Sequence, residues 1–478
     1  DEMMRRIDTG EPLYLFDPSE CPDLVDAVGD EFTQLYTKYI HKAETGDIRL
    51  WRKVESQEFF KKYLFKLAKT GHPWLTFKDA HNRNNPCPRY NVIHSTNLCT
   101  EISIPNSPDS TAVCTLASLN LSQHIDLKTN DFDWEKLDDT VETMVMALDN
   151  ILDRNFYPSH ESRKNTMDLR PLGIGVMGFA EALVRLGIPY DSDGAVKLSQ
   201  ALSKRIRDVA YNTSESLAES RGAFQHYIDM ENAGTPYNYP ARRNSVLLAI
   251  APTASISIIA GTTSTIDSYF SNIYSRDTLS GKFIVVNKQL MRYLEDHELW
   301  SDEMFEQIKS QNGSIQFIEA LDGNIDKALF KTAYEIHPNR QIEIAAAFQE
   351  HIDQAVSKSL YIDETLRDKM TDIYLYAWKM GLKSTYYCFI DKTIKGEKYT
   401  SKVNKRGARR GFGKAQPADE NTPATVSEPL PENGEHFAEL EREAREKFGD
   451  AVVDQVIKGD VESCPTDPLL AKICPSCE

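Results

Sequence analysis

Residues 245–257 read SVLLAIAPTASIS and decide the fold class of this chain. The first seven of them, Ser245–Ala251, form a continuous apolar run of strand length, which stops at Pro252. A strand that is apolar along its whole length is typical of a sheet covered on both faces. The segment therefore predicts a buried strand, followed by a loop of small and hydroxyl-bearing residues that leads into a helix.

Helical patterns lie on both sides of this strand in the sequence. Apolar residues recur at spacings of three and four from about Lys136 to Asp153, and again from Leu198 to Val209, which predicts two amphipathic helices. Further on, a helix is expected to close at Gly381, ahead of the strand-like segment Ser384–Ile390. Helices and strands thus alternate from about Asn97 to Ile390, which predicts an α/β architecture with largely buried strands.

Residues Gly173–Gly178 have the Gly-x-Gly-x-x-Gly spacing of a dinucleotide-binding fingerprint. That fingerprint needs a buried strand directly before it, and the preceding residues Asp168–Leu172 do not have the composition of one. We therefore interpret the glycines as positions of close helix packing rather than as a cofactor site.

The composition excludes several classes of protein. The chain has 478 residues, 41% of them apolar, which is enough for a sizeable core in one large domain or in two to three domains. Its net charge of −17 does not favour binding to nucleic acid or to an anionic membrane. The sequence has no run long enough for a membrane span and no signal-peptide core at its start, so we expect a cytoplasmic protein.

The eight cysteines are too sparse for a secreted disulfide scaffold, so we expect free thiols. Two of them, Cys474 and Cys477, form a Cys-x-x-Cys pair at the end of a proline-rich tail. This spacing suits either half of a zinc site or a dithiol that cycles to a disulfide. Because Cys464 is the only further cysteine nearby in the sequence, we favour the redox role and predict no metal site. A tethered dithiol of this kind implies a buried partner disulfide.

Asn97, Cys99 and Glu101 occupy alternate positions in the sequence. In an extended chain their side chains would emerge on one face, where an amide, a thiol and a carboxylate base would converge. A strand edge with unrelated polar residues has the same spacing, so the pattern alone leaves both interpretations open.

Five motifs resemble, in this order, those of one enzyme family: Asn97–Ile102 (NLCTEI), Cys114–Leu121 (CTLASLNL), Pro252–Ser257 (PTASIS), Tyr386-Tyr387 and the Cys474/Cys477 pair. Together they are similar to the large subunit of a class I ribonucleotide reductase. The resemblance covers essentially the whole chain but only the C-terminal, catalytic part of such a subunit, as in a split-subunit form. It implies the C-terminal half of a ten-stranded α/β barrel with an internal finger loop, plus a flexible C-terminal tail.

The resemblance implies a role for each residue of the first two motifs. Cys99 would carry the thiyl radical that removes hydrogen from C3′ of the ribose. Glu101 would be the base on the 3′ hydroxyl, and Asn97 would hydrogen-bond the substrate. Cys114 would be one of two thiols that reduce the 2′ position and end as a disulfide.

The remaining motifs would serve radical transfer, re-reduction and substrate binding. Two consecutive tyrosines are ordinarily strand packing, but beside the other motifs Tyr386 and Tyr387 would relay the radical to Cys99. Cys474 and Cys477 would re-reduce the active-site disulfide. Backbone N–H groups and hydroxyls after the buried strand would hold the substrate diphosphate at a helix N-terminus. The expected phosphate-binding residues are Pro252, Thr253, Ala254, Ser255, Ile256 and Ser257.

The same resemblance implies the reaction and the partners. The reaction would be the reduction of ribonucleoside diphosphates to deoxyribonucleoside diphosphates by thiyl-radical chemistry. This chain would bind no cofactor; a metal-containing small subunit would supply the radical, and thioredoxin or glutaredoxin the electrons. A second reducing cysteine has no upstream match, because Cys21 and Cys87 lie too near Cys99 in sequence. We therefore expect an N-terminal half to act in trans, within an oligomer.

The expected domains are a helical and irregular lead-in over residues 1–90, the second half of the barrel over 91–395, and the flexible tail over 396–478. Two alternative functions stay open. One is another thiyl-radical barrel enzyme, of the glycyl-radical or cobalamin type, which would not need a tyrosine relay. The other is an inactive zinc-binding scaffold derived from a reductase.

Overall fold

The structure is a computed structural model, which describes residues 1–126, 128–278, 281–390, 442, 445–450 and 452–453. The chain divides into two compact units, residues 1–396 and 397–478, and every element named below belongs to the first unit. Cys464, Cys474 and Cys477, on which the predicted tail dithiol depends, lie outside the described residues, as does most of the predicted tail.

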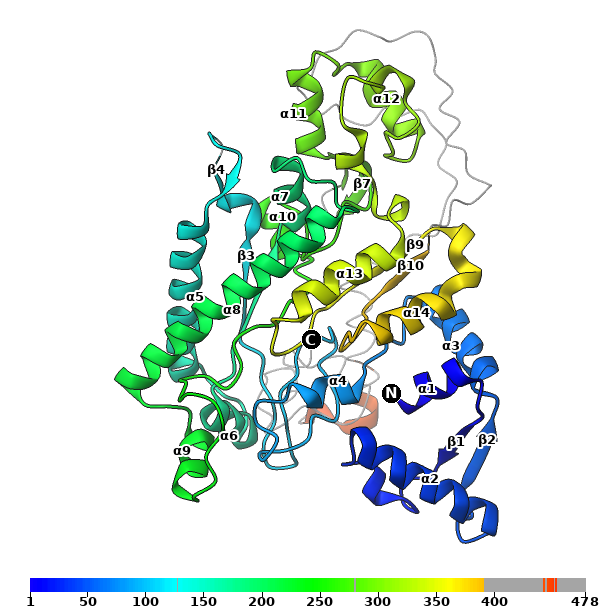
Figure 1. Cartoon of the computed structure of the whole chain (residues 1–478), viewed down its shortest axis with the longest axis vertical. Coiled ribbons are helices and arrows are strands. Elements are labelled where there is room, and N and C mark those ends of the chain that lie inside the picture. The colour runs from blue at the N-terminus through cyan, green and yellow to red at the C-terminus, as the bar shows by residue number, and fades with distance from the viewer. Residues whose placement is uncertain (127, 279–280, 391–441, 443–444, 451, 454–478) are drawn as a thin grey trace. The chain divides into compact units, whose positions relative to one another are not determined.

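The described helices and strands are shown in Figure 1. The helices are α1 (Glu2–Thr9), α2 (Gly29–Thr45), α3 (Ser56–Thr70), α4 (Lys78–Arg83), α5 (Trp134–Arg154), α6 (His160–Leu169), α7 (Phe179–Arg185), α8 (Asp193–Arg221), α9 (Gln225–Asn232), α10 (Ile256–Ala260), α11 (Lys288–Asp296), α12 (Asp302–Ser310), α13 (Pro338–Gln349) and α14 (Met370–Lys379). The strands are β1 (Leu13–Phe16), β2 (Trp51–Val54), β3 (Leu116–Asn120), β4 (Ile125–Asp126), β5 (Asp131–Phe132), β6 (Gly173–Met177), β7 (Ile273–Thr278), β8 (Gly281–Val286), β9 (Leu360–Ile362) and β10 (Cys388–Ile390).

A parallel ladder of extended segments runs through the centre of the first unit. β3 pairs with β6, and β9 pairs with β10, both in parallel. Two isolated parallel bridges, Ile174 to Leu248 and Ile250 to Val356, join these pairs through the extended segments around 246–250 and 355–358. The order of the segments along the ladder follows their order in the sequence. Parallel neighbours need crossover connections, and the helices that alternate with the strands supply them, which confirms the predicted α/β class.

The first part of the chain adds an antiparallel neighbour at the far edge of this ladder. Thr76 bridges Ser384 in antiparallel orientation. The Phe77 N–H donates to the Lys383 carbonyl at 2.8 Å, and the Thr385 N–H donates to the Leu75 carbonyl at 2.8 Å. Residues 75–77 therefore continue the ladder beside the segment that carries Tyr386.

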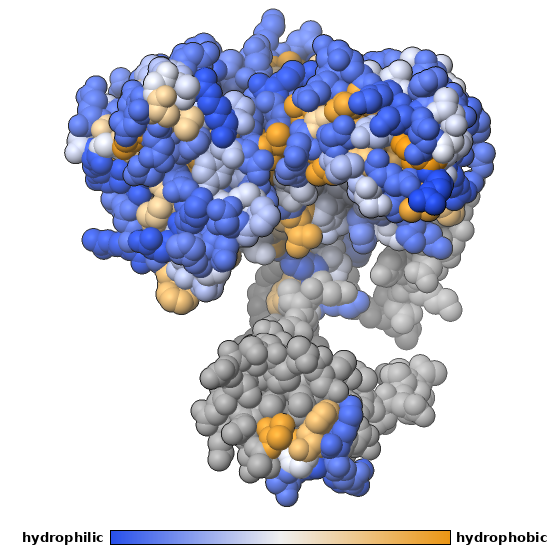
Figure 2. All heavy atoms as spheres, turned by 90° about the horizontal axis from the view of Figure 1, so that it is seen from below, coloured by the Kyte–Doolittle hydropathy of each residue, from blue (hydrophilic) through white to orange (hydrophobic). Residues whose placement is uncertain are grey.

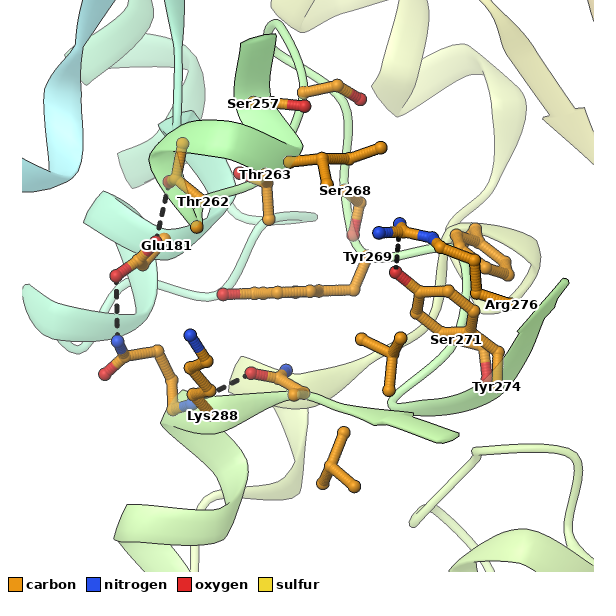
Figure 3. Close-up of a pocket in the computed structure, with 18 of the residues that line it drawn as sticks. Glu181, Ser257, Thr262, Thr263, Ser268, Tyr269, Ser271, Tyr274, Arg276 and Lys288 are labelled. Carbon is orange, nitrogen blue, oxygen red and sulfur yellow. Dashed lines mark hydrogen bonds between the residues drawn. The ribbon is translucent and has the colours of Figure 1, made fainter. Parts of the chain in front are cut away.

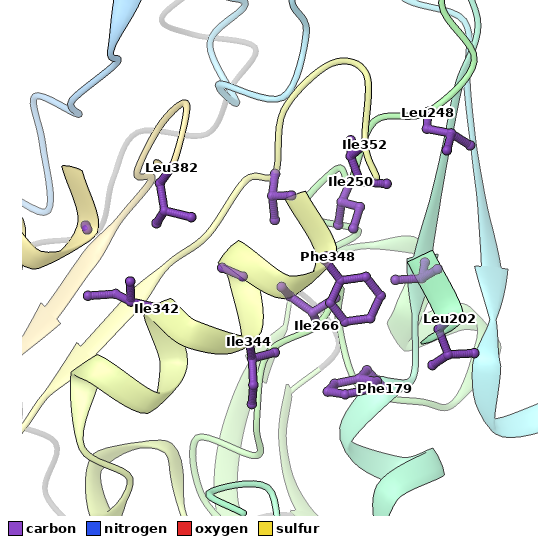
Figure 4. Packing of buried hydrophobic residues seen from close by; sticks show 14 of the residues in the cluster. Phe179, Leu202, Leu248, Ile250, Ile266, Ile342, Ile344, Phe348, Ile352 and Leu382 are labelled. Atoms are coloured by element: carbon purple, nitrogen blue, oxygen red, sulfur yellow. The ribbon is translucent and has the colours of Figure 1, made fainter. Parts of the chain in front are cut away.

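The segment 245–251, predicted as a strand, is buried as its composition indicates, but it joins its neighbours through two isolated bridges and is not one of the regular strands. Leu247, Leu248 and Ile250 are fully buried, and helices from both flanks of the sequence cover this region. α8 packs against α5 and against α13, and the rings of Phe179 and Phe348 meet edge to face at 5.2 Å between centroids (Figure 4). The predicted helices around 136–153 and 198–209, and the one closed by Gly381, are confirmed as α5, α8 and α14.

The prediction that Gly173–Gly178 serves helix packing is wrong. Residues Gly173–Met177 form β6, in which every residue is buried. A Cβ on Gly175 would lie 2.4 Å from the Ala249 carbonyl oxygen, so only glycine lets the two segments approach. Gly178, at φ +76°, turns the chain into α7. The glycines therefore permit close contact between strands, a role that the spacing alone does not reveal.

The outer surface of the first unit is mainly polar on the face that Figure 2 shows, where hydrophobic side chains form small separate patches. Among the described residues, no helix is both long enough and apolar enough to cross a membrane.

The buried carboxylate of Asp149 joins three helices to the start of the extended segment at 245–251. Asp149, on α5, is fully buried and accepts hydrogen bonds from Arg170 Nε at 2.9 Å and Nη2 at 2.7 Å. It also faces Arg221 Nη1 on α8 at 3.2 Å and accepts from Asn244 Nδ2 at 3.2 Å. Arg170 directly follows α6, so one carboxylate fixes the angle between α5, α6 and α8.

Replacing Asp149 with alanine is expected to lower the free energy of unfolding by about 3 kcal/mol, because the buried Arg170 guanidinium keeps only the half-exposed Asp153 as a carboxylate partner. Urea unfolding of the full chain measures this value. The matched control is Asp138→Ala, which removes the more exposed pair with Arg205 between the same two helices and should cost less than about 1 kcal/mol. Equal losses in the two variants would contradict the structural role of Asp149.

Candidate active site

Cys99 lies in a turn at the tip of a long connection, not in an extended segment. Residues 91–115 contain no helix or strand, and the Thr100 N–H donates to the Asn97 carbonyl at 3.1 Å. Thr100 is left-handed at φ +68°, a conformation that costs a non-glycine residue energy and is typical of functional turns. The prediction that Asn97, Cys99 and Glu101 share one face of an extended chain is therefore wrong.

A serine from the parallel ladder holds both the backbone of Cys99 and the carboxylate of Glu101. The Ser357 hydroxyl contacts both the Cys99 carbonyl and Glu101 Oε2, the latter at 3.1 Å. The Glu101 carbonyl accepts the Ala355 N–H at 2.9 Å, and the Glu101 side chain is only 2% exposed. Glu101 is thus a buried carboxylate that Ser357 holds in a fixed position, two residues from Cys99 in the sequence. A carboxylate in a fixed position can act as a general base on a ligand within its reach.

The side chain of Asn97 closes the same turn. Its Oδ1 accepts the Ile102 N–H at 3.1 Å, which leaves its amide NH₂ as the group that can donate to a ligand. Cys99 and Asn97 are half-buried, whereas Leu98 between them is 83% exposed. In this turn Asn97 and Cys99 are therefore shielded from solvent, whereas the apolar side chain of Leu98 is exposed.

The Cys114 thiol lies close enough to Glu101 for the charge of that carboxylate to shift the thiol pKa. Partial desolvation raises the pKa of the Cys114 thiol, and the negative charge of Glu101 raises it further. The other cysteines considered as a second reducing thiol are packed elsewhere. Cys21 is buried against the Asp17 carbonyl, and Cys87 is buried in a cluster with Tyr237 and Tyr239, where burial raises its pKa to about 12.

The structure brings Tyr386 from the far end of the ladder to the Cys99 thiol. The Tyr386 hydroxyl donates to Cys99 Sγ at 3.6 Å, and the rings of Tyr386 and Tyr387 meet at 4.4 Å between centroids. Burial raises the pKa of Tyr386, and the hydrogen bond to Cys99 adds to the shift. The phenol therefore stays protonated at neutral pH, with its O–H directed at sulfur.

Trp74 belongs to this aromatic group, although sequence reasoning missed it. Its ring lies 4.6 Å from that of Tyr386 and 5.2 Å from that of Tyr387. Its Nε1–H donates to the Gly71 carbonyl at 3.1 Å, which fixes the ring plane. Trp74 precedes the antiparallel segment 75–77, and only that long-range pairing places it here. No sequence signal links it to residues more than 300 positions away.

The predicted phosphate-binding loop follows the strand next to Ser357. The Ser357 N–H donates to the Ile250 carbonyl at 2.9 Å, two residues before the loop starts at Pro252. Thr253, at φ +53°, accepts the Thr265 N–H on its hydroxyl at 2.7 Å, so this hydroxyl braces the loop. α10 then begins at Ile256. The loop thus starts at the carboxyl end of its strand, where ligands bind in α/β proteins.

Within the described part of the chain, no group of three or more histidine, cysteine, aspartate or glutamate side chains is placed to hold a metal ion. The tail cysteines are not in that part, so the predicted absence of a metal and the zinc alternative both stay untested.

A buried histidine behind the Cys99 turn makes the fold sensitive to acid. His81 is 2% exposed, and its Nδ1 hydrogen-bonds the Ser103 hydroxyl at 2.6 Å. Burial, together with the charge of Lys383, lowers the pKa of His81 to about 3. Because the unfolded chain takes up this proton near pH 6.5 and the folded chain does not, stability is lost as the pH falls below that value.

We expect this histidine to remove about 0.8 kcal/mol of stability between about pH 7.5 and about pH 6.0. His81→Gln keeps a polar group opposite Ser103 but does not titrate, so the variant should lack this part of the pH dependence. Urea unfolding of both proteins at the two pH values measures the difference. Parallel losses in the two proteins would show that His81 does not take up the proton on unfolding.

Comparison with known proteins places this architecture in a family. A sequence model of the ribonucleotide reductase barrel domain matches residues 1–388. The ribonucleoside-diphosphate reductase subunit alpha of Chlamydia pneumoniae is 36% identical over 441 residues, covering 85% of this chain and 42% of that protein. The corresponding large chain of Neurospora crassa is 38% identical over 410 residues, covering 81% of this chain and 43% of its own.

A solved structure agrees with the sequence matches. The alpha subunit of the class Id ribonucleotide reductase of Actinobacillus ureae has a TM-score of 0.61 and 28% identity, covering 70% of this chain and 61% of that chain. This chain spans less than half the length of the two sequence relatives. The match over residues 1–388 nevertheless takes in the ladder up to the first residue of β10, the Cys99 turn and both tyrosines. The chain therefore has an α/β barrel fold and belongs to the ribonucleotide reductase barrel-domain family.

Proposed function

We propose that this chain is the catalytic part of the large subunit of a ribonucleoside-diphosphate reductase, and that it converts ribonucleoside diphosphates to deoxyribonucleoside diphosphates. The observation that carries the proposal is the contact of the Tyr386 hydroxyl with Cys99 Sγ at 3.6 Å, beside the buried carboxylate of Glu101. The relatives named as ribonucleoside-diphosphate reductases support the same activity.

Radical transfer to the thiol is the first step that this geometry allows. A small subunit that holds a metal supplies the oxidising radical, and Tyr387 and Tyr386 pass it on. The Tyr386 phenoxyl takes the hydrogen atom of the Cys99 thiol, so that an O–H bond forms as the S–H bond breaks. The short contact matters because hydrogen transfer needs its two heavy atoms near hydrogen-bond distance. The Cys99 thiyl then takes hydrogen from C3′ of the ribose, and the thiol returns a hydrogen atom to C3′ after the 2′ position is reduced, which restores the thiyl.

Glu101 and Asn97 act on the ribose hydroxyls. The Glu101 carboxylate removes the proton of the 3′ hydroxyl, and the Ser357 hydroxyl at 3.1 Å holds the carboxylate in position. Asn97 donates from its amide NH₂, since its Oδ1 already accepts the Ile102 N–H. Because Glu101 is almost fully buried, its charge acts with little screening by water.

Cys114 supplies hydrogen for the reduction itself. Its raised pKa keeps the thiol protonated at neutral pH, which suits a group that must deliver hydrogen to the 2′ position. Cys114 and a second thiol lose two hydrogens and form a disulfide, while the 2′ hydroxyl leaves as water. Cys474 and Cys477 then reduce that disulfide by exchange, and thioredoxin or glutaredoxin restores them.

The loop at 252–257 holds the substrate diphosphate. For the N–H groups of Ala254, Ser255 and Ile256, no backbone acceptor is recorded among the described residues. N–H groups at the start of a helix are ready donors to phosphate oxygens. Binding through the backbone needs no basic patch, which agrees with the net charge of −17.

The N-terminal half of the barrel completes the site. Among the described residues, no strand pairs with the second edge of β3, and Leu116 on this strand is 36% exposed. An open parallel edge calls for further strands. We propose that the ladder is half of a ten-stranded barrel around the finger loop at 91–115, and that an N-terminal half acting in trans pairs with β3 and supplies the second thiol.

The assay for this function combines the full chain with the N-terminal half, a small subunit carrying its radical, a dithiol and CDP. We expect dCDP to form in the complete mixture and to disappear when the small subunit is omitted. Product formation without the small subunit would favour a relay-independent thiyl-radical enzyme. The absence of dCDP in every mixture, with stoichiometric zinc on the isolated chain, would favour the inactive scaffold.

A further inference from the structure

A buried ion pair joins two segments that the proposed reaction uses separately. Lys358 Nζ contacts Asp267 Oδ1, and the two side chains are only 1% and 6% exposed. Among the described residues, no other ion pair is recorded for either of them. Taking two charges out of water costs free energy, and apolar side chains of similar volume often serve stability as well or better. The presence of charges here therefore points to a role beyond stability.

Lys358 belongs to the segment that holds the Cys99 turn and the relay tyrosine. It directly follows Ser357, whose hydroxyl contacts the Cys99 carbonyl and the Glu101 carboxylate. The Lys358 carbonyl accepts the Tyr386 N–H at 2.8 Å. A displacement of this segment would therefore move the thiol, the carboxylate and the phenol together.

Asp267 belongs to the turn that braces the loop at 252–257. Two residues before it, the Thr265 N–H donates to the Thr253 hydroxyl at 2.7 Å. Both threonines have left-handed backbones, at φ +43° and φ +53°, a conformation that persists only where the surrounding structure holds it. The Asp267 N–H closes the turn by donating to the Ser264 carbonyl at 3.2 Å. The Asp267 carboxylate is thus fixed to the same turn as the hydrogen bond that braces the loop.

The chain around Asp267 also forms part of the wall of a cavity beside the loop. The volume of this cavity is about 530 Å³, and its lining includes Ala254 and Ser257 of the loop and Ser268, the residue after Asp267 (Figure 3). Neither Lys358 nor Asp267 lines it. The ion pair is therefore placed to set the position of this wall from behind, without contacting a ligand in the cavity.

We propose that Lys358 and Asp267 are positioning residues, which hold the loop at 252–257 at a fixed distance from the Cys99 thiol. The inference rests on the proposed reductase function, in which the loop holds the diphosphate while the thiyl takes hydrogen from C3′ of the same substrate. The distance between loop and sulfur then decides whether C3′ lies within reach. A misplacement of about 1 Å can cost about a hundredfold in rate.

The test replaces both charges, in the double variant Lys358→Met with Asp267→Val. No buried charge is left unpaired, so we expect urea unfolding to give nearly the original midpoint. The directional contact is lost, so kcat for dCDP formation in the complete mixture should fall at least about tenfold. The KM for CDP should change less than about threefold, because the N–H groups of the loop remain.

A single variant covers the case in which the apolar pair does not fold well. Asp267→Asn keeps the shape of the side chain and weakens the contact by removing its charge. The same pattern should appear in smaller measure, with a loss of about threefold in kcat and little change in KM.

The control for a loss of stability alone is Asp149→Ala, which also breaks a buried ion pair. In the described part of the chain, no hydrogen bond or ion pair of Asp149 to the Cys99 turn or to the loop at 252–257 is recorded. This variant should show the opposite pattern, a lower urea midpoint with an unchanged kcat for its folded fraction.

Hydrogen exchange followed by mass spectrometry tests the positioning without any turnover. In the double variant, peptides that cover 253–268 and 384–387 should exchange at least about tenfold faster than in the original protein. If the original chain formed no dCDP, the proposed function would fail, and exchange would still decide whether the pair holds the two segments. Unchanged exchange in both peptides, or a kcat that stays at its original value, would overturn the proposal.

Discussion

Replacing Cys99 with serine is expected to lower turnover by at least about a thousandfold, the scale on which loss of one member of a catalytic unit acts. Serine has nearly the volume of cysteine and leaves the turn at 97–100 intact. Its O–H bond is, however, too strong to yield a radical under the same conditions. CDP binding should persist, because the proposed substrate contacts come from Asn97, Glu101 and the loop at 252–257. The assay is dCDP formation in the complete mixture, with CDP binding measured separately.

The matched control for this experiment is Cys21→Ser. Cys21 is also buried, and its thiol donates to the Asp17 carbonyl at 3.2 Å, a bond that a serine hydroxyl can keep. We expect the control to retain turnover close to that of the original protein. If Cys99→Ser retained substantial activity, Cys99 would not be the radical-bearing thiol, and the proposed function would be contradicted.

The sequence predicts local elements well where one physical requirement dominates. The run at 245–251 is apolar because both faces are covered, which predicts a buried extended segment, and the structure has one, although isolated bridges rather than a regular strand join it to its neighbours. α5 follows from the apolar spacing between Lys136 and Asp153, since one face must meet the core. The glycines of β6 show the limit of this reasoning. They are needed because of the close approach of Ala249, and that contact exists only once the ladder has formed.

The same limit applies to the candidate site. The alternate positions of Cys99 and Glu101 do not by themselves distinguish a site from a strand edge, and they predict an extended segment where the chain makes a turn at Thr100. Family resemblance alone points to Tyr386, because no pairwise signal in the sequence links it to Cys99, 287 residues away. Trp74 reaches the tyrosines through an antiparallel bridge that pairs Thr76 with Ser384. Contacts set by strand order could not be read from the sequence of either partner.

The order of the extended segments also explains why the Cys99 turn and Tyr386 lie close together. Ser357, on the segment next to 246–250, holds both the Cys99 carbonyl and the Glu101 carboxylate. Ser384, on the next segment, donates to the Thr100 carbonyl at 3.0 Å. The turn is therefore fixed from two neighbouring segments, and the second of them also carries Tyr386. Rigid scaffolds of this kind position reactive groups more closely than loops can by themselves.

Replacing Tyr386 with phenylalanine is expected to lower kcat by at least about a thousandfold, as for other groups that act as a unit. The ring can still pack against Trp74 and Tyr387, at 4.6 and 4.4 Å in the original protein. The variant lacks only the hydroxyl that reaches Cys99 Sγ, so no hydrogen atom can pass to the thiol. The KM for CDP should change little, because Tyr386 has no proposed substrate contact. Steady-state dCDP formation gives both constants.

The control for this variant is Tyr361→Phe, in the neighbouring strand. Tyr361 packs on Phe389 at 5.1 Å and lies edge to face with Tyr334 at 5.5 Å, but no hydrogen bond of its hydroxyl to Cys99 is recorded among the described residues. Turnover should therefore survive. If Tyr386→Phe kept much of its activity, the radical would have to reach Cys99 by another route. Trp74 is the aromatic side chain already in contact with both tyrosines, and Trp74→Leu in the Tyr386→Phe background would then decide whether it carries that route.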